Sequence, residues 1–319
     1  MRVRGATTIA DDACDDEEPM TMNDANPPQR VRPGADGTTD AAVDAVVHAL
    51  VRARRDGTPA CARVAEALRD ADDAYAVQDR VAQALGWFAD GAPRWWKSGG
   101  ASRESVQTHA PLPPAGVWAS PVSRERCAAA ARDGTCVPRL RGIEAEIALR
   151  LGRDVDAQVA ARLDPDGARA LVDVMAVTIE IVESRWSEAL DAGALAKLAD
   201  LQSHGALVVG AWRPFDAGRD WSAQVCRVTL GDAPVLEFRG THSMRDPAWV
   251  LPAWLRHATR HGAVLRAGTV VTTGTWCGLP LAKAGDLVRA EFPGIGEAVV
   301  ALDHGSSGGQ RCAHGAAAS

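Results

Sequence analysis

The sequence predicts an α+β fold, in which a helical N-terminal region precedes a mainly antiparallel or mixed β-sheet. Two observations lead to this class. Residues 39–90 carry apolar side chains at helical spacing, whereas from about residue 116 short runs typical of β-strands stand between glycine, proline and aspartate turns. Helices followed by a series of strands are the pattern of α+β proteins. The 319 residues, of which 46% are hydrophobic, suffice for one large domain or two modest ones.

The helical region opens with the segment DAAVDAVVHALVRARRDG at 40–57, which has an acidic start and a glycine stop. Residues 62–87 continue the same spacing and predict two further helices. We assign residues 39–115 to this N-terminal helical region, which includes a loop around Lys97. Before it, residues 1–38 are acidic and poor in large apolar side chains, so we expect a disordered acidic tail.

A β-rich domain is predicted to span residues 116–303, with residues 304–319 as a second disordered tail. Helical interruptions of this domain are expected at 166–176 and at 246–262. In the second, Asp246 is the expected N-cap and Pro247 the first helical residue. Seven runs rich in β-branched residues are the candidate strands: 142–152, 174–186, 204–212, 223–232, 268–276, 286–294 and 296–303.

The charge and cysteine content exclude several classes of protein. The formal net charge is −6, and residues 1–40 account for −5 of it (nine acidic residues against four arginines), so the rest is close to neutral. No basic stripe is present that would bind nucleic acid. The seven cysteines show no C-x-x-C pair or zinc spacing, which indicates reduced thiols in a cytoplasmic protein. No apolar run reaches the ~20 residues of a membrane span, and the acidic N-terminus lacks the apolar core of a signal peptide.

Three glutamates in otherwise apolar strands are the strongest sign of chemistry. In the segment RGIEAEIALRLGRDV, Glu144 and Glu146 fall on one strand face and apolar side chains on the other. Glu180 stands alone among the apolar side chains of MAVTIEIV. Carboxylates without histidine or cysteine nearby are hard oxygen ligands, which suit Mg²⁺, Mn²⁺ or Ca²⁺ rather than zinc. A solvated strand face is the alternative for the first pair, and Glu183 is the rival third ligand, although an extended strand would place it opposite Glu180.

Five segments of the chain carry a resemblance to a known family. They are WKSGG at 96–100, the E-x-E strand, IEIVESR at 179–185, LADLQSHGALVVG at 198–210 and GTVVTTGTWCGLPLAKAGDLVRAEFPGIG at 268–296. In their order and spacing they resemble the 2-keto-4-pentenoate hydratase family. That family is a branch of the fumarylacetoacetate hydrolase superfamily, and the branch includes the 4-oxalocrotonate decarboxylases. The resemblance covers roughly residues 75–303.

The resemblance implies a compact mixed β-roll with an N-terminal helical region, and an enzyme of the hydro-lyase class. It implies that Glu144, Glu146 and Glu180 hold Mg²⁺ or Mn²⁺, and that Lys97 and Ser203 are the active-site lysine and the substrate-side serine. The family's substrates are 2-oxo or 2-hydroxy-dienoic acids. The expected reaction therefore adds water to a compound such as 2-hydroxypenta-2,4-dienoate and gives a 4-hydroxy-2-oxo acid. The family also suggests a homo-oligomer. The charge pattern and the lack of an apolar span predict neither nucleic acid nor a membrane as partner.

The chain departs from the family at positions that bear on the substrate. Leu201 and Gln202 stand where the family commonly has Asn-Ala, and His204 follows the serine. No acidic residue follows Glu104 in the segment after the lysine, so a second acid–base carboxylate is not identified. The H-x-x-E motif of the hydrolase branch is absent from the sequence, which argues against hydrolysis of a carbon–carbon bond. Two rival functions remain: a 4-oxalocrotonate-type decarboxylase, and a non-catalytic member that binds metal.

Three further positions receive structural interpretations. Desolvation by the two adjacent tryptophans is expected to lower the pKa of Lys97. Arg185 is expected to form a structural ion pair. His257 and His261 are four residues apart on a predicted helix. Without the glutamate of an H-E-x-x-H motif, we expect both histidines on a solvated face rather than at a metal.

Overall fold

The computed structural model describes residues 37–89, 91–132, 134–135 and 139–304. The two predicted tails lie almost entirely outside these residues. The first helix begins at Gly37, two residues before the start that the sequence predicts.

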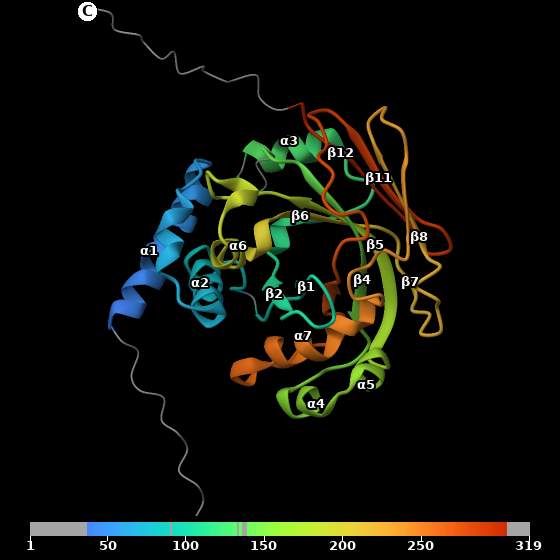
Figure 1. Ribbon diagram of the computed structural model, residues 1–319, viewed down its shortest axis with the longest axis horizontal. Helices are drawn as coiled ribbons and strands as arrows, with labels where there is room; N and C mark the ends of the chain where they lie inside the picture. The colour runs from blue at the N-terminus through green and yellow to red at the C-terminus, as the bar shows by residue number, and fades with distance from the viewer. Residues whose placement is uncertain (1–36, 90, 133, 136–138, 305–319) are drawn as a thin grey trace, which may run out of the picture. The chain divides into compact units, whose positions relative to one another are not determined.

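N-terminal helices are present, as the sequence predicts (Figure 1), and they form a layer with a hydrophobic core of its own. The layer consists of α1 (Gly37–Asp56), the 3₁₀-helix η1 (Ala62–Ala67), α2 (Ala71–Ala84) and α6 (Ala194–Ala199). Apolar side chains at helical spacing, among them Val46, Leu50 and Val77, are fully buried between these helices.

The β-rich part contains two sheets. The larger has the strand order β2-β1-β10-β4-β5-β6-β3, with β7 paired to β5 off this path, and the smaller has the order β12-β11-β8-β9. The strands of the larger sheet are β1 (Trp95–Gly99), β2 (Thr108–Pro111), β3 (Val117–Ala119), β4 (Gly142–Leu151), β5 (Val172–Val182), β6 (His204–Val209), β7 (Arg213–Pro214) and β10 (Val270–Thr272). Those of the smaller sheet are β8 (Val225–Leu230), β9 (Leu236–Arg239), β11 (Leu287–Phe292) and β12 (Gly296–Ala301). The β1–β10 and β3–β6 pairs are parallel and the other pairs are antiparallel, so the larger sheet is mixed.

The two sheets share the main hydrophobic core. Ile147 and Ile179 of the larger sheet belong to one buried cluster with Val288 and Phe292 of the smaller sheet. The remaining helices are α3 (Arg124–Arg132), α4 (Ala157–Arg162), α5 (Pro165–Arg169), α7 (Leu251–Ala258) and the 3₁₀-helices η2 (Pro114–Gly116), η3 (Ala189–Asp191), η4 (Leu201–Ser203), η5 (Pro247–Val250) and η6 (Arg260–Gly262). The Asp246 side chain accepts a hydrogen bond from the N–H of Ala248, which confirms the predicted N-cap.

Two local predictions differ from the structure. The helix expected at 166–176 ends at Arg169, because the β-branched run from Val172 onward pairs with β4 and becomes strand β5. Lys97 was expected in a loop and lies on strand β1. The two tryptophans before it favour an extended strand, and parallel pairing with β10 holds it in the sheet.

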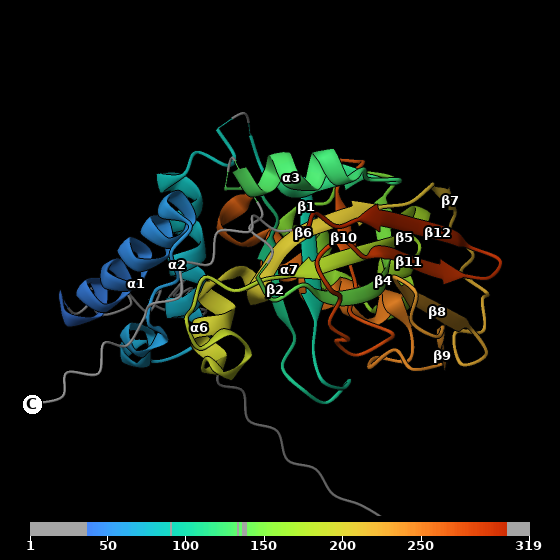
Figure 2. The ribbon, with the colours of Figure 1, turned by 90° about the horizontal axis from the view of Figure 1, so that it is seen from above.

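The large sheet curves around the face that carries the glutamates. Lys97 on β1 and Glu180 on β5 are three strand positions apart in the sheet order, which corresponds to about 14 Å in a flat sheet. Their side chains nevertheless meet, with 2.5 Å between Nζ and Oε1. Figures 1 and 2 show the strands turning from β6 through β5 and β4 toward β1 and β2. The sheet therefore forms a roll, and the chemistry lies on its inner face.

The cysteines and the helix lengths bear on two classes of protein considered from the sequence. Cys61, Cys127, Cys226 and Cys277 are free thiols in the part of the chain that the structure describes, and all but Cys61 are buried. Buried free thiols of this kind pack as small apolar side chains. No helix in the described ranges is both long and apolar enough to cross a membrane.

Candidate metal centre and active site

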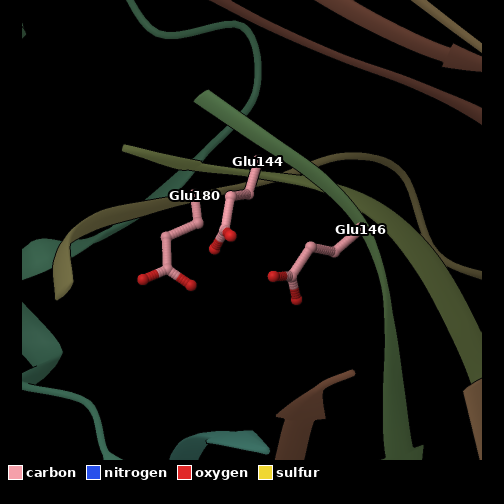
Figure 3. Close-up of side chains that lie close together, drawn as sticks. All are labelled: Glu144, Glu146 and Glu180. Atoms are coloured by element: carbon pink, nitrogen blue, oxygen red, sulfur yellow. The ribbon is translucent and has the colours of Figure 1, made fainter. Parts of the chain in front are cut away.

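Strands β4 and β5 bring three glutamates together on the inner face of the roll. Antiparallel pairing places Glu144 directly opposite Glu180 and Glu146 opposite Thr178, so the alternation of side chains puts all four on one face. One carboxylate oxygen from each of Glu144, Glu146 and Glu180 lies within 4.8 Å of the others. Figure 3 shows the three side chains converging. Like charges this close repel, and a cation bound between the carboxylates would offset the repulsion.

Hydrogen bonds fix two of the three carboxylates. Glu146 Oε2 accepts from the Thr272 hydroxyl and, at 2.9 Å, from the N–H of Gly274. Glu180 Oε1 accepts from Lys97 Nζ at 2.5 Å and from His204 Nδ1 at 3.1 Å. Glu180 Oε2 is buried and has no hydrogen-bond partner among the described residues. A buried carboxylate oxygen without a partner is costly unless something else, such as a bound cation, satisfies it.

The pKa values of the three carboxylates are shifted in different directions, two upward and one downward. Burial, only partly offset by Lys97, raises the pKa of Glu144 to about 8, and burial together with the charge of Glu180 raises that of Glu146 to about 7. Burial acts on Glu180 in the same direction, but the Lys97 ammonium and the His204 hydrogen bond outweigh it and hold the Glu180 pKa below its ordinary value. The cluster therefore favours one ionised carboxylate beside two that keep their protons until neutral pH.

These shifts predict how the metal-free protein responds to pH. Between the ordinary carboxyl pKa of 4.5 and the raised values, the folded chain keeps protons that the unfolded chain has lost, so stability falls as the pH rises. We expect the melting temperature in a chelator to drop by several degrees from pH 6.5 to 8. The histidines with lowered pKa values, His109, His204, His242 and His257, act in the opposite direction, but mainly around and below their ordinary pKa of 6.5, so the fall should be clearest between pH 7 and 8.

Added Mg²⁺ or Mn²⁺ should remove this slope, because the cation binds the ionised carboxylates. The Glu146→Gln variant is the control, since it has one titrating group fewer and should show a shallower slope in the chelator. Differential scanning fluorimetry over the pH series measures both. A melting temperature that stays level or rises toward pH 8 in the chelator would contradict the assignment of these pKa shifts.

The environment of Lys97 corrects one sequence-based expectation. Burial does disfavour the ammonium, as predicted from the adjacent tryptophans, but the charges of Glu180, Glu144 and Glu146 outweigh it and raise the Lys97 pKa. The expected lowering is therefore wrong. Lys97 Nζ donates to Glu180 Oε1 and, at 3.3 Å, to the backbone carbonyl of Gln202. Lys97 is thus a charged group that faces the carboxylates.

A strained turn at residues 201–203 adjoins this cluster, because its Gln202 carbonyl accepts a hydrogen bond from Lys97. Leu201, Gln202 and Ser203 have φ values of 54°, 55° and 59°, a left-handed conformation that costs free energy for residues other than glycine. Asp200 anchors the turn, because its carbonyl accepts from the Ser203 N–H at 2.9 Å. The Ser203 hydroxyl is buried, and no side chain or backbone group in the described ranges bonds to it. Its O–H is therefore available to a ligand.

Arg185 forms the structural ion pair that the sequence predicts. Its Nε lies 2.6 Å from Oδ1 of the fully buried Asp200, and Arg54 donates to the same oxygen at 3.0 Å. The two arginines thus fix Asp200, the residue whose carbonyl anchors the strained turn. Glu183, the rival third ligand, is also accounted for. Its carboxylate accepts from the backbone N–H groups of Arg139 and Leu140, away from the other glutamates.

The expectation for the two helical histidines is correct for His261 and wrong for His257. His261 is exposed, but His257 is half-buried and its ring packs on Tyr75 and His109 with centroid distances of 4.3 and 4.7 Å. Burial and the neighbouring His109 lower the pKa of His257 to about 2. Tyr75 lies on α2 and His109 on β2. The spacing of residues within the helix of His257 cannot predict contacts with these other elements.

Two residues of the site were not identified from the sequence. His204 was noted only as a departure from the family pattern, and its contact with Glu180 depends on the pairing of β6 with β5. Thr272, which donates to Glu146, lies in a run of apolar and threonine residues that gives no functional signal. His204 and Thr272 are recognised as parts of the site only from their contacts with Glu180 and Glu146 on other strands.

Comparison with known sequences places the chain among related enzymes. A protein-family model described as fumarylacetoacetate (FAA) hydrolase C-terminal matches residues 96–302. The chain is 29% identical over 261 residues to 2-keto-4-pentenoate hydratase 2 of Dechloromonas aromatica (strain RCB), covering 80% of this chain and 95% of that protein. It is 34% identical over 157 residues to the 2-keto-4-pentenoate hydratase of Paraburkholderia phymatum, covering 48% of this chain and 57% of that protein.

Comparison with solved structures agrees on the fold. The 4-oxalocrotonate decarboxylase from Pseudomonas putida G7, complexed with calcium and acetate, has a TM-score of 0.66 at 16% identity, over 82% of this chain and 98% of that chain. The same enzyme complexed with magnesium and adipate has a TM-score of 0.67 at 15% identity, over 82% of this chain and 97% of that chain. At such identities the likeness establishes a common fold and leaves the reaction to other evidence.

Proposed function

Because the chain belongs to the fumarylacetoacetate hydrolase family, we propose that it adds water to a 2-hydroxy-dienoate such as 2-hydroxypenta-2,4-dienoate and gives a 4-hydroxy-2-oxo acid. The predictions of this family, of the α+β roll and of an enzyme of the hydro-lyase class are confirmed by the family match, the fold and the names of the relatives. The observation that carries the proposal of this reaction is the convergence of three carboxylates and Lys97 on the inner face of the roll.

We assign Glu144, Glu146 and Glu180 as the ligands of Mg²⁺ or Mn²⁺. The side chains fit such a cation, because all three are hard oxygen donors and the buried Oε2 of Glu180 lacks a partner in the described part of the chain. When bound, the cation would supply Lewis acidity to the oxo-acid end of the substrate.

The chain's own groups would handle the protons and the orientation of the substrate. Lys97 Nζ carries a proton beside the carboxylates, where it can stabilise the charge that develops on a dienolate or transfer a proton to its far carbon. The unpaired Ser203 hydroxyl can donate a hydrogen bond to a substrate oxygen. The buried Leu207, directly opposite Glu180 in the β5–β6 pair, helps to exclude bulk water and so strengthens these interactions.

Two observations favour this reaction over the rival functions. A decarboxylase for a dicarboxylic substrate needs a cation for the second carboxylate, and the arginines that reach the Ser203 turn, Arg54 and Arg185, are both engaged with Asp200. A non-catalytic member would have no use for a buried lysine and a buried unpaired serine next to the carboxylates. We further propose a cytoplasmic homo-oligomer, on the basis of the free cysteines and the family resemblance.

The proposed reaction is tested by incubating the purified protein and Mg²⁺ with 2-hydroxypenta-2,4-dienoate. We expect the dienol absorbance to decay and the product mass to show the gain of one water. The same assay with 2-oxo-hex-3-enedioate, the substrate type of the decarboxylase, should show no loss of CO₂. Loss of CO₂ without hydration would replace the hydratase by the decarboxylase, and the absence of turnover with both would leave only the metal-binding member.

A further inference from the structure

We infer that His204 is a positioning residue that holds Glu180 as a one-oxygen ligand and thereby makes the centre prefer Mg²⁺ or Mn²⁺ over Ca²⁺. This inference rests on the proposed metal centre. It concerns a side chain to which the family resemblance gives no role, and which stands at a departure from the family pattern.

An irregularity in the sheet brings His204 to the site. In the β5–β6 pair, Glu180 stands opposite Leu207 and Ile181 opposite Ala206, but Val182 stands opposite His204. One extra residue, Gly205, is thus inserted on the β6 side. In an uninterrupted strand, His204 would share the face of Ala206, in the main core. The inserted residue turns the His204 side chain to the other face, where Glu180 lies.

The surroundings of His204 select one tautomer of its ring. The side chain is 1% exposed, and Nδ1 lies 3.1 Å from Glu180 Oε1. A carboxylate oxygen can only accept, so Nδ1 must carry the hydrogen. The other ring nitrogen, Nε2, is buried without a partner among the described residues. The opposite tautomer would leave a buried N–H unpaired and set two lone pairs against each other, which is costlier than one unpaired lone pair.

Glu180 therefore presents its two oxygens differently. Oε1 is occupied by two donors, Lys97 Nζ from β1 and His204 Nδ1 from β6, whereas Oε2 has none. Figure 3 shows one oxygen of Glu180 directed toward the other two carboxylates and one directed away. Because two donors hold Oε1, rotation of the carboxylate to offer both oxygens to a cation would break these hydrogen bonds.

The same arrangement recurs at Glu146. Its Oε2 is also occupied by two donors, the Thr272 hydroxyl and the Gly274 N–H, which leaves Oε1 for a cation. Two of the three ligands are thus restricted to one oxygen each. Ca²⁺ takes six to eight oxygens and commonly uses carboxylates through both oxygens, whereas Mg²⁺ takes six at shorter distance. A centre whose carboxylates are held in this way suits the smaller ion.

The test compares ion affinities in variants of His204 by calorimetry. His204→Leu keeps the bulk and removes the donor, whereas His204→Asn keeps an N–H at the position of Nδ1. We expect His204→Leu to bind Mn²⁺ about 10-fold more weakly, at the lower end of the effect of losing a partner behind a ligand. Ca²⁺ affinity should change little or rise, because Glu180 gains freedom to use both oxygens. His204→Asn should restore the Mn²⁺ affinity and the selectivity.

Two outcomes would overturn the inference: unchanged selectivity in His204→Leu, with or without an equal loss of affinity for both ions, or a failure of His204→Asn to keep the preference. An equal loss would mark His204 as merely structural. If the wild-type protein binds no Mn²⁺, the proposed metal centre itself fails, which is a different result. Thr272→Val, a change of similar volume, provides a second route if the leucine variant does not fold. It frees Glu146 in the same way and should also shift the preference toward Ca²⁺.

Discussion

The Lys97→Met variant is expected to turn over a 2-hydroxy-dienoate at least about 100-fold more slowly than the wild type, the usual scale for losing a general acid–base or a charge that stabilises the transition state. Methionine keeps much of the volume of the stem on β1 and removes the ammonium that lies 2.5 Å from Glu180. Because the charge on the substrate grows in the transition state, the effect should fall on kcat more than on KM.

Metal and oxalate binding separate this role from a packing role. Mn²⁺ affinity in Lys97→Met should change by less than about tenfold, because loss of a donor to Glu180 is offset by removal of a positive charge near the cation. Oxalate, a mimic of the oxo-acid end, should bind only modestly more weakly. Lys283→Met is the matched control, since that lysine is exposed. Wild-type turnover in Lys97→Met would exclude the lysine from the mechanism, and complete loss of oxalate binding would make it a ground-state anchor.

The Glu146→Gln variant should lose Mn²⁺ affinity by more than about 100-fold, beyond the 10–100-fold typical of a partner behind a ligand, because a charged ligand itself is removed. Glutamine matches the shape of glutamate and can still accept from the Thr272 hydroxyl and the Gly274 N–H. The fold should therefore persist while the site loses a negative charge. Turnover should fall with the metal affinity.

Calorimetric titration of Mn²⁺ into wild type, Glu146→Gln and the exposed control Glu104→Gln measures this effect. The control should bind like wild type, because Glu104 lies outside the cluster. Equal Mn²⁺ affinity in Glu146→Gln and wild type would show that the three glutamates do not hold the cation. In a chelator, Glu146→Gln should be more stable than wild type near pH 8, because one buried charge is removed.

The part of the site that the sequence predicts lies within strongly periodic strands. Alternation along β4 is enough to place Glu144 and Glu146 on one face, and Glu180 is conspicuous among apolar neighbours on β5. Both inferences need only the two-residue repeat of a strand. Lys97 and Ser203, by contrast, come from the family resemblance, since nothing in their local sequence distinguishes them from a surface lysine and a loop serine.

What the sequence does not predict depends on contacts between distant segments. The pKa of Lys97 has the opposite sign from the expectation, because three carboxylates from β4 and β5 outweigh the desolvation that its neighbours cause. His204 reaches Glu180 only because one residue is inserted in β6, and a single inserted residue reverses the face of every side chain before it. Neither the charge balance nor the inserted residue leaves a pattern in the sequence.

The sheet order also determines when the site can assemble during synthesis. Strand β1 reaches β4 only through β10, which begins at Val270, whereas β4, β5 and β6 follow one another in the chain and pair directly. Chains leave the ribosome from the N-terminus. The nascent protein therefore carries a paired set of carboxylates while Lys97 still lacks the strand that seats it. About the last sixth of the polypeptide, from Val270 onward, therefore completes the site. A chain that ends before Val270 would pair the strands of the three glutamates but would lack the strand that connects Lys97 to them.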